Sequence, residues 1–212
     1  MREVLLSTAY LPPIQYFTKI IRYERVLIEQ HENYSKQSYR NRCMILGANG
    51  PLSLSVPVVK SPGGKQPVKD IKIDYATDWQ KLHWKAIGSA YGKSAFYLYL
   101  HDDLKPFYFH KHTFLFDYNC KLLETLLALI GIRKNIGLTD EFCPDPVIAD
   151  DFRESIHPKS RKQKNDAAFM PERYYQVFGT KHGFLPNLSI IDLLFNEGSE
   201  SFIYLKKSAG MS

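Results

Sequence analysis

A run of basic residues in the first quarter of the chain offers the clearest candidate chemistry. Arg40 and Arg42 are separated by a single residue, so on a β-strand their side chains would point to one side while Tyr39 and Asn41 faced the other. Two guanidinium groups, with Lys36 nearby, suit a phosphate or carboxylate because they donate charge-assisted hydrogen bonds. The alternative is that these cations flank a strand and are only solvated. The run therefore predicts a class of ligand, namely an anion, and no particular reaction.

His83 is the residue best suited to proton transfer, because imidazole titrates near neutral pH. It lies one helical turn from Trp79 and from Ile87, and such apolar neighbours also fit a structural histidine of the core. Cys43 could act as a nucleophile beside it, but a cysteine entering an apolar strand is more often a small core residue. We therefore predict His83 as a catalytic base, with packing as the alternative.

Asp192 and Asn196 are four residues apart, which places them on one face of a helix. A carboxylate and an amide in this arrangement could serve a site, with Asp192 in catalysis and Asn196 in substrate binding. Capping and loop contacts would explain the same pair, and for Asn196 they are the simpler interpretation.

A metal site is a weaker interpretation of the histidines and acids between residues 101 and 112. Imidazole and carboxylate are common zinc and iron ligands, but their spacing here matches no recognised ligand pattern. We therefore predict no metal site and a polar surface cluster of His101, Asp102, Asp103, His110 and His112.

Composition indicates one folded domain in a reducing compartment. The chain has 212 residues, of which 44% are hydrophobic and 14% aromatic, which argues against disorder. Its three cysteines contain no CxxC pair, and its N-terminal apolar run is too short to span a membrane, so we expect a cytoplasmic protein. The net charge of +6 permits anionic partners but also suits ordinary soluble enzymes. No P-loop, dinucleotide-binding glycine pattern or nucleophile elbow is present, so the cofactor stays unknown.

The elements that would position these residues predict a mixed α/β (α+β) fold. Residues 1–75 form the sheet-rich part, with strands near 4–7 and 25–29 around a helix at 13–23, and an alternating strand at 70–74. The direction in which the first two strands pair is left open. A hairpin joins the runs 40–46 and 52–58 through Asn49-Gly50, which supplies the positive φ values that a tight turn needs.

The rest of the domain, residues 76–212, is predicted to be helix-rich. Thr77 and Gln80 suggest a capping box for a helix ending near Tyr91, and a second helix covers 94–103. A core helix at 113–130 is terminated by Gly131. Residues 155–170, with the basic run 159–164, are predicted as an exposed, mobile loop, and a capped amphipathic helix follows at 186–195, before the break at Gly198.

Three segments carry a resemblance to a known family: the opening run 10–17, the run 38–42 with its hairpin, and the run 79–83. Together they resemble the WbqC-like protein family, and the later segments 156–159, 175–178 and 187–196 resemble a subgroup of the Bacteroides lineage. Many members open with a Gln-Pro-Tyr type of motif, whereas this chain has Ser7-Thr8-Ala9-Tyr10, so a role tied to that Gln does not transfer.

The resemblance implies a transferase of surface polysaccharide or O-antigen (lipopolysaccharide) synthesis, with transfer of an aminoacyl group such as glycine to a nucleotide-linked amino sugar. The implied partner is that nucleotide-linked sugar, or another phosphorylated small molecule, held by Lys36, Arg40, Arg42, Tyr10 and Asn196. A non-catalytic binding protein that organises a pathway complex is the second hypothesis. Nucleic-acid binding through the basic run is a weaker one, because no recognised module is present. The oligomeric state is not predicted.

Overall fold

The computed structural model describes residues 2–59, 63–146 and 149–211. Its central element is a parallel sheet with the strand order β5-β2-β1-β6. The strands are β1 (Glu3–Ser7), β2 (Arg25–Glu29), β5 (Ile136–Leu138) and β6 (Ala149–Asp151), and every pairing between neighbours is parallel. The direction left open from the sequence is thus settled, because residues 8–24 form a crossover that contains helix α1 (Ile14–Arg22).

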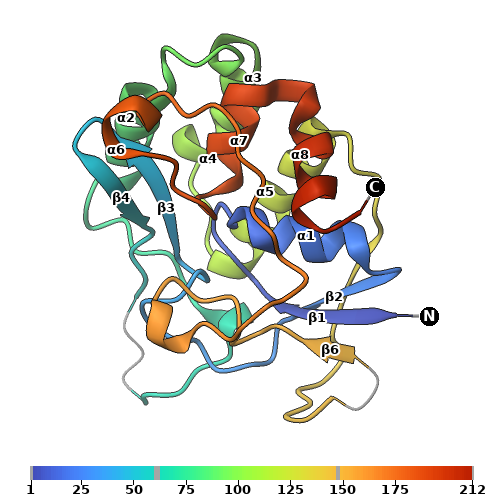
Figure 1. Ribbon diagram of the computed structural model, residues 1–212. Coiled ribbons are helices and arrows are strands. Elements are labelled where there is room, and N and C mark those ends of the chain that lie inside the picture. The colour runs from blue at the N-terminus through green and yellow to red at the C-terminus, as the bar shows by residue number, and fades with distance from the viewer. Residues whose placement is uncertain (1, 60–62, 147–148, 212) are drawn as a thin grey trace.

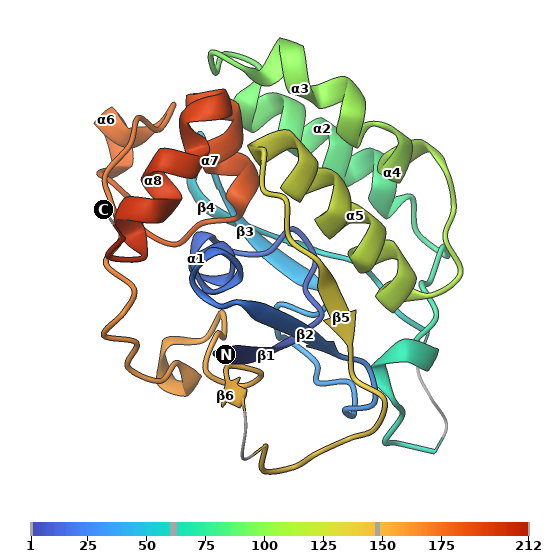
Figure 2. The same cartoon turned by 90° about the vertical axis from the view of Figure 1, so that its right-hand side faces the viewer.

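Both edge strands come from the second half of the chain. Residues 1–75, predicted as the sheet-rich part, therefore supply only β1 and β2 of this sheet. Strands β5 and β6 have three residues each and come from beyond residue 135. Figure 2 shows α1 end-on beside β1 and β2, with α5 (Leu115–Ile130) alongside it. Strand β1 is buried nearly throughout, as expected of a covered parallel strand.

The predicted hairpin is present as a separate antiparallel sheet. It consists of β3 (Arg42–Gly47) and β4 (Gly50–Ser55), in which Gly47 pairs with Gly50. Gly50 adopts φ 111°, a conformation that favours glycine. The predicted strand at 70–74 is wrong: this region contains a short 3-10 helix, η1 (Val68–Asp70), followed by isolated bridges such as Val58 with Ile73.

Helices gather over the sheet and the hairpin (Figure 1). The middle of the chain forms α2 (Trp79–Tyr91), α3 (Tyr97–Leu104), α4 (Pro106–Phe109) and α5. The C-terminal part forms η2 (Ser160–Lys162), α6 (Gly179–His182), α7 (Ile190–Glu197), η3 (Gly198–Glu200) and α8 (Ser201–Ser208). The mixed α and β content predicted from the sequence is confirmed.

Of two helix ends predicted from the sequence, one is confirmed and the other is wrong. Gly131 ends α5 in the left-handed region with φ 81°, as predicted. The capping box at the start of α2 is wrong, because Asp78 is the N-cap residue and makes no capping hydrogen bond. Gln80 instead donates to the carbonyls of Phe107 and His110, at 2.9 and 2.7 Å, and so fastens α2 to the end of α4.

Candidate functional site

Charged side chains meet at the carboxyl ends of β1 and β2. In parallel α/β sheets this edge is the usual place for a ligand. Glu29, the last residue of β2, is fully buried, and its carboxylate accepts hydrogen bonds from Arg153 Nη1 at 3.2 Å and from Thr139 Oγ1 at 2.9 Å. Arg153 also holds Asp151 through Nε and Nη2. Sequence reasoning missed this group, because its members come from distant parts of the chain; the only local signal was a charged residue ending a buried strand.

Arg40 belongs to the same edge. It lies in a turn before β3, so the strand alternation expected to align it with Arg42 does not apply, and that prediction is wrong. Its guanidinium is 2% exposed and binds Glu32 through Nε at 2.8 Å and through Nη2 at 2.5 Å. Nη2 also donates to Ser7 Oγ and to Glu154 at 2.9 and 2.8 Å. These partners occupy Nε and Nη2, two of the three guanidinium nitrogens that Arg40 was predicted to offer a phosphate.

Lys36 and Arg42 do share a cavity, of about 420 Å³. Its wall includes Tyr34, Lys36, Gln37, Asn41, Arg42 and Gln66. Asn41 lies on the same cavity as Arg42, so the expectation that it faces away is wrong; its Nδ2 donates to the Val56 carbonyl at 2.8 Å. Arg42 Nε donates to Ser55 Oγ at 3.0 Å. Lys159 of the late basic run reaches Gln37 at the edge of this cavity.

The charge of this cavity is positive. Two cations and no carboxylate occur among its described lining residues. Within the described part of the chain, neither Lys36 nor Arg42 has an acidic group within ion-pair distance. Burial raises the pKa of Tyr34 to about 12, although Arg40 and Arg42 both act to lower it. The neutral tyrosine therefore adds a hydroxyl and no negative charge to the wall.

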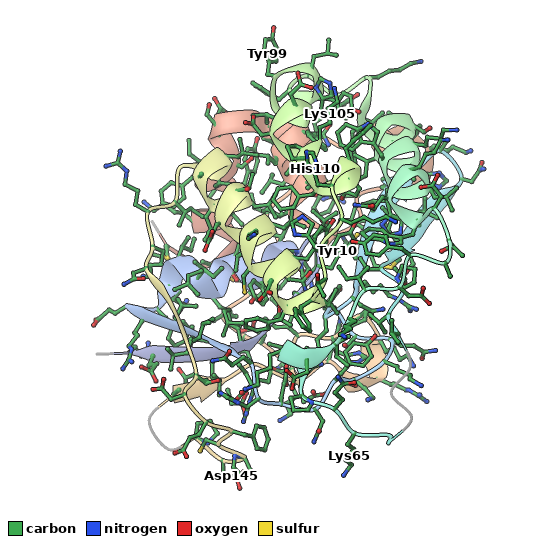
Figure 3. The ribbon with its side chains drawn as sticks, turned by 180° about the vertical axis from the view of Figure 1, so that it is seen from behind. Tyr10, Lys65, Tyr99, Lys105, His110 and Asp145 are labelled. Atoms are coloured by element: carbon green, nitrogen blue, oxygen red, sulfur yellow. The ribbon has the colours of Figure 1, made fainter. Side chains whose placement is uncertain are left out.

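His83 and Tyr10 lie together in the core. Figure 3 shows Tyr10 in the interior, whereas Tyr99 lies at the periphery. The Tyr10 hydroxyl is 2.9 Å from His83 Nδ1 and 2.9 Å from the Tyr108 hydroxyl. Burial lowers the pKa of His83 to about 4, against a small opposing effect of a hydrogen bond to the Ser55 backbone. These are the contacts of a core histidine, and catalysis by His83 stays a prediction.

Asp192 is also buried, at 1% exposure, and only neutral groups bind it. It accepts hydrogen bonds from Tyr91 at 2.9 Å, from Tyr174 at 2.6 Å and from Gln176 at 3.0 Å. Burial raises the pKa of its carboxyl group to about 6, while these three donors act to lower it. Asn196 uses Nδ2 to bind the Asp192 backbone carbonyl at 2.7 Å, so the two side chains do not form the predicted pair.

The structure thus separates the predicted site residues into groups. Lys36 and Arg42 line the cavity of about 420 Å³. Arg40 does not line it and belongs to a buried ionic network with Glu32. Tyr10 and His83 form one core cluster, and Asp192 with Asn196 belongs to another.

Two further features bear on the predicted classes of function. Among the described residues, no group of three or more His, Cys, Asp or Glu side chains could hold a metal ion. None of the described helices combines the length and apolar character needed to cross a membrane. The predicted mobile loop at 155–170 is exposed over residues 161–165 but is anchored at one side, where Gln163 Nε2 donates to the His157 carbonyl at 2.8 Å.

A parallel sheet flanked by helices, with polar cavities beside it, defines an α/β protein. Comparison with known proteins gives its family: residues 8–150 match the model of the WbqC-like protein family, and the chain belongs to that family. It is 28% identical over 235 residues to "Uncharacterized protein Rv1507c" of Mycobacterium tuberculosis (strain ATCC 25618 / H37Rv), with 97% of this chain and 98% of that protein covered. No solved structure was found to match the chain. The resemblance to a Bacteroides subgroup stays a prediction.

Proposed function

We propose that this protein is a transferase of surface polysaccharide synthesis that binds a nucleotide-linked sugar in the cavity of Lys36 and Arg42. The observation that carries the proposal is the charge of that cavity, which combines two cations with no carboxylate in its described lining. The WbqC-like family is associated with genes of polysaccharide biosynthesis. Nucleotide-linked sugars are the donors of such pathways, and their diphosphate is the kind of anion this wall suits.

The chemistry of the wall fits a diphosphate in more than its charge. Arg42 has one guanidinium nitrogen fixed by Ser55, which restrains the side chain and leaves the remaining N–H groups for a bidentate contact. Lys36 supplies a second cation from the preceding loop. The hydroxyl of Tyr34 and the amides of Asn41 and Gln66 add polar groups for a sugar or a base. A volume of about 420 Å³ is within the usual range for small-molecule sites.

Transfer of an aminoacyl group, such as glycine, to an amino sugar is the finer form of the proposal. The amine of the sugar would attack the acyl carbon of an activated aminoacyl ester, and the C–O bond to the carrier would break so that the carrier leaves. The amine must also lose a proton, and His83 or Asp192 would accept it if ligand binding exposed either side chain. A phosphorylated small molecule other than a nucleotide sugar would use the same two cations.

The first experiment is calorimetric titration of the protein with UDP, UDP-N-acetylglucosamine and other nucleotide sugars. Arg42→Ala and Lys36→Ala should each weaken binding about tenfold, because each removes a charge-assisted contact worth about 1.5 kcal/mol. Binding should also weaken as salt is raised. Lys85→Ala, an exposed cation of α2, is the matched control and should bind as the wild type does. Equal affinity of all four proteins would refute the assignment of this cavity.

A non-catalytic binding protein is the second candidate, and one observation favours it. Neither His83 nor Asp192 is among the residues that line the cavity, so the predicted proton-transfer groups are apart from the predicted ligand. The exposed side chains of Leu98, Tyr99 and Phe109, on α3 and α4, would provide an interaction face. Nucleotide-sugar binding without turnover, together with pathway partners that survive His83→Gln in a pull-down, would support this candidate.

A further inference from the structure

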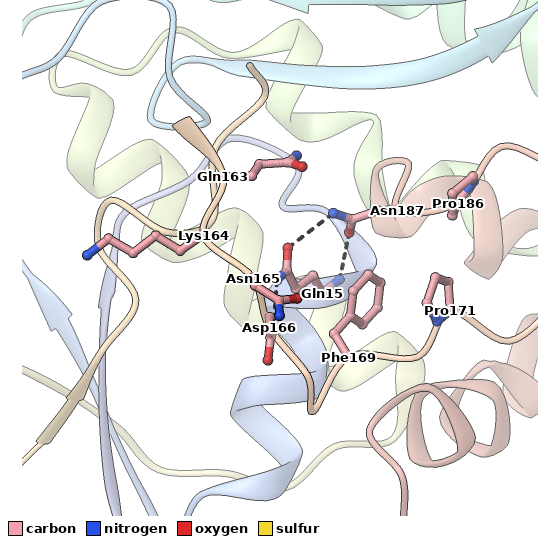
Figure 4. Close-up of a pocket in the computed structure, with 9 residues that line it drawn as sticks. All are labelled: Gln15, Gln163, Lys164, Asn165, Asp166, Phe169, Pro171, Pro186 and Asn187. Atoms are coloured by element: carbon pink, nitrogen blue, oxygen red, sulfur yellow. Dashed lines mark hydrogen bonds between the residues drawn. The ribbon is translucent and has the colours of Figure 1, made fainter. Parts of the chain in front are cut away.

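A second cavity, of about 470 Å³, opens beside the first turn of α1 (Figure 4). Its wall includes Gln15 of α1, the stretch from Gln163 to Asp166, Phe169, and Asn187 from the segment before α7. None of the predicted catalytic or substrate-binding residues lies on it, although Gln163 and Lys164 belong to the basic run 159–164. It is therefore distinct from the cavity of Lys36 and Arg42.

Three polar side chains of this cavity hold one another in fixed orientations (Figure 4). Gln15 Nε2 donates to Asp166 Oδ2 at 2.8 Å, and Gln15 Oε1 accepts from Asn187 Nδ2 at 3.2 Å. Asn187 Oδ1 accepts the backbone N–H of Gln15 at 2.9 Å. Asn187 also adopts φ 58°, a left-handed conformation that asparagine tolerates better than most residues. The polar wall is thus built before any ligand arrives, which lowers the cost of binding.

A buried lysine of α1 neutralises the carboxylate of Asp166. Lys19 of α1, whose side chain is 1% exposed, places Nζ 2.5 Å from Asp166 Oδ2 and 4.8 Å from the centre of the Phe152 ring. Burial lowers the pKa of Lys19, while Asp166 acts to raise it. The charged pair leaves the floor of the cavity with no net charge, so the site has no electrostatic preference for a cationic ligand.

One oxygen of the same carboxylate remains for a ligand. Both Lys19 and Gln15 bind Oδ2, and no side-chain donor within the described ranges reaches Oδ1. Asn187 has a second N–H on Nδ2, and Asn165 and Gln163 add further amide groups at the rim. The wall and rim therefore offer both acceptors and donors, and a hydroxyl group can use both because it donates and accepts.

An aromatic ring completes the wall. Phe169 is half-buried against the core, and two prolines lie near it in the lining. A sugar ring has hydroxyl groups at its edge and C–H groups on its faces, so it can bind amides and a carboxylate while it packs on an aromatic side chain. A fully charged ligand would instead need several charges of one sign, whereas the described lining holds one charge beyond the neutralised Asp166, that of Lys164.

We infer that this cavity is a carbohydrate-binding site for an uncharged sugar ring, with Asp166 Oδ1 and the Asn187 amide on its hydroxyl groups and Phe169 against its face. The inference does not depend on nucleotide binding in the other cavity. If both hold, the protein has separate places for a phosphorylated ligand and for an uncharged sugar ring. The segment from His157 to Asp166 contacts both cavities. Its last residues line the sugar cavity, and Lys159 within it reaches Gln37, which lines the other cavity.

Saturation-transfer NMR tests the site with free N-acetylglucosamine, glucose and galactose as probes. At least one sugar should bind saturably with a millimolar dissociation constant, and Phe169→Ala should weaken that binding about tenfold. Gln163→Ala, an exposed rim variant, should weaken it less. Asp166→Asn should also weaken it, and its melting temperature reports whether the buried Lys19 still allows folding.

The matched control is Gln66→Ala, which alters the wall of the other cavity. It should leave sugar binding unchanged, and Phe169→Ala should leave UDP binding unchanged, so failure of this site and failure of the nucleotide site are separable. The inference is overturned if none of the sugars binds, or if folded Phe169→Ala and Gln163→Ala proteins bind as tightly as the wild type. It is also overturned if inorganic phosphate alone binds and competes at this cavity.

Discussion

The guanidinium of Arg40 holds both carboxylate oxygens of Glu32, at 2.8 and 2.5 Å, and both side chains are buried. Removing one partner of such a pair leaves the other charge without compensation in the interior. This pair therefore fastens the turn before the hairpin to the edge of the sheet. Glu32 neutralises the charge of Arg40 inside the fold.

Arg40→Ala should accordingly lower the free energy of unfolding by about 3 to 5 kcal/mol. The matched control is Arg25→Ala, because Arg25 pairs with Glu3 at 3.0 Å but is 62% exposed, and such pairs contribute about 1 kcal/mol or less. Urea denaturation measures both. A loss of nucleotide binding in a fully stable Arg40→Ala protein would contradict this and return Arg40 to the ligand.

Gly198, the first residue of η3, should not tolerate a side chain. It adopts φ 55°, and a Cβ atom there would lie 2.5 Å from the Phe96 ring. Gly198→Ala should therefore cost at least about 3 kcal/mol, from backbone strain and overpacking together. Gly131→Ala is the control, since φ is 81° but the space is open, and it should cost about 1 kcal/mol. Similar thermal shifts for the two variants would disprove the clash.

Asp192 should make the protein less stable as pH rises. Its folded pKa of about 6 lies above the ordinary 3.8, so the folded state binds its proton more tightly and the stabilisation present below pH 4 is lost between pH 4 and 6. The free energy of unfolding should fall by about 3 kcal/mol over these two pH units. Asp192→Asn should remove this component from the pH profile of unfolding. A profile identical to that of the wild type would show that Asp192 does not titrate abnormally.

His83 should act with the opposite sign. Its folded pKa of about 4 lies below the ordinary 6.5, so the unfolded state binds the proton more readily and stability falls as pH drops from 6.5 to 4. The expected contribution is about 3 kcal/mol over that interval. His83→Gln should flatten this slope while its oxygen still accepts from Tyr10. His110→Gln, at an exposed position, serves as the control and should keep the wild-type slope.

Local signals explain which elements could be predicted. The hairpin and α5 were predictable because their turn glycine, alternation and helical spacing all lie within the segment itself. Strands β5 and β6 have three residues each, too few for a periodic pattern, and they exist only because β2 and β1 offer free edges. The alignment of Arg40 with Arg42 failed for a similar reason: a strand that begins at Arg42 cannot orient a residue in the turn that precedes it.

The candidate sites show the same limit. Lys36 and Arg42 are six residues apart, and the cavity that joins them was within reach of sequence reasoning. The pairing of Gln15 with Asp166 spans 151 residues and left no trace in local composition. A charged lysine in the middle of an apolar helix face was the one available hint, since Lys19 must find a partner once α1 is buried.

The contacts of the segment before α7 have a consequence for how the chain can be divided. Ile14 N–H binds the Leu188 carbonyl at 3.0 Å, Ile190 N–H binds the Pro12 carbonyl at 2.8 Å, and Ser189 Oγ binds the Leu11 carbonyl at 2.9 Å. Residues 11–14, where α1 begins, are thus hydrogen-bonded to residues 188–190, where α7 begins. The region that the family model matches, residues 8–150, therefore does not include the partners of these hydrogen bonds at residues 188–190. A protein shortened to end there would lose α7 and α8, which pack against α1, and should be recovered only as aggregate.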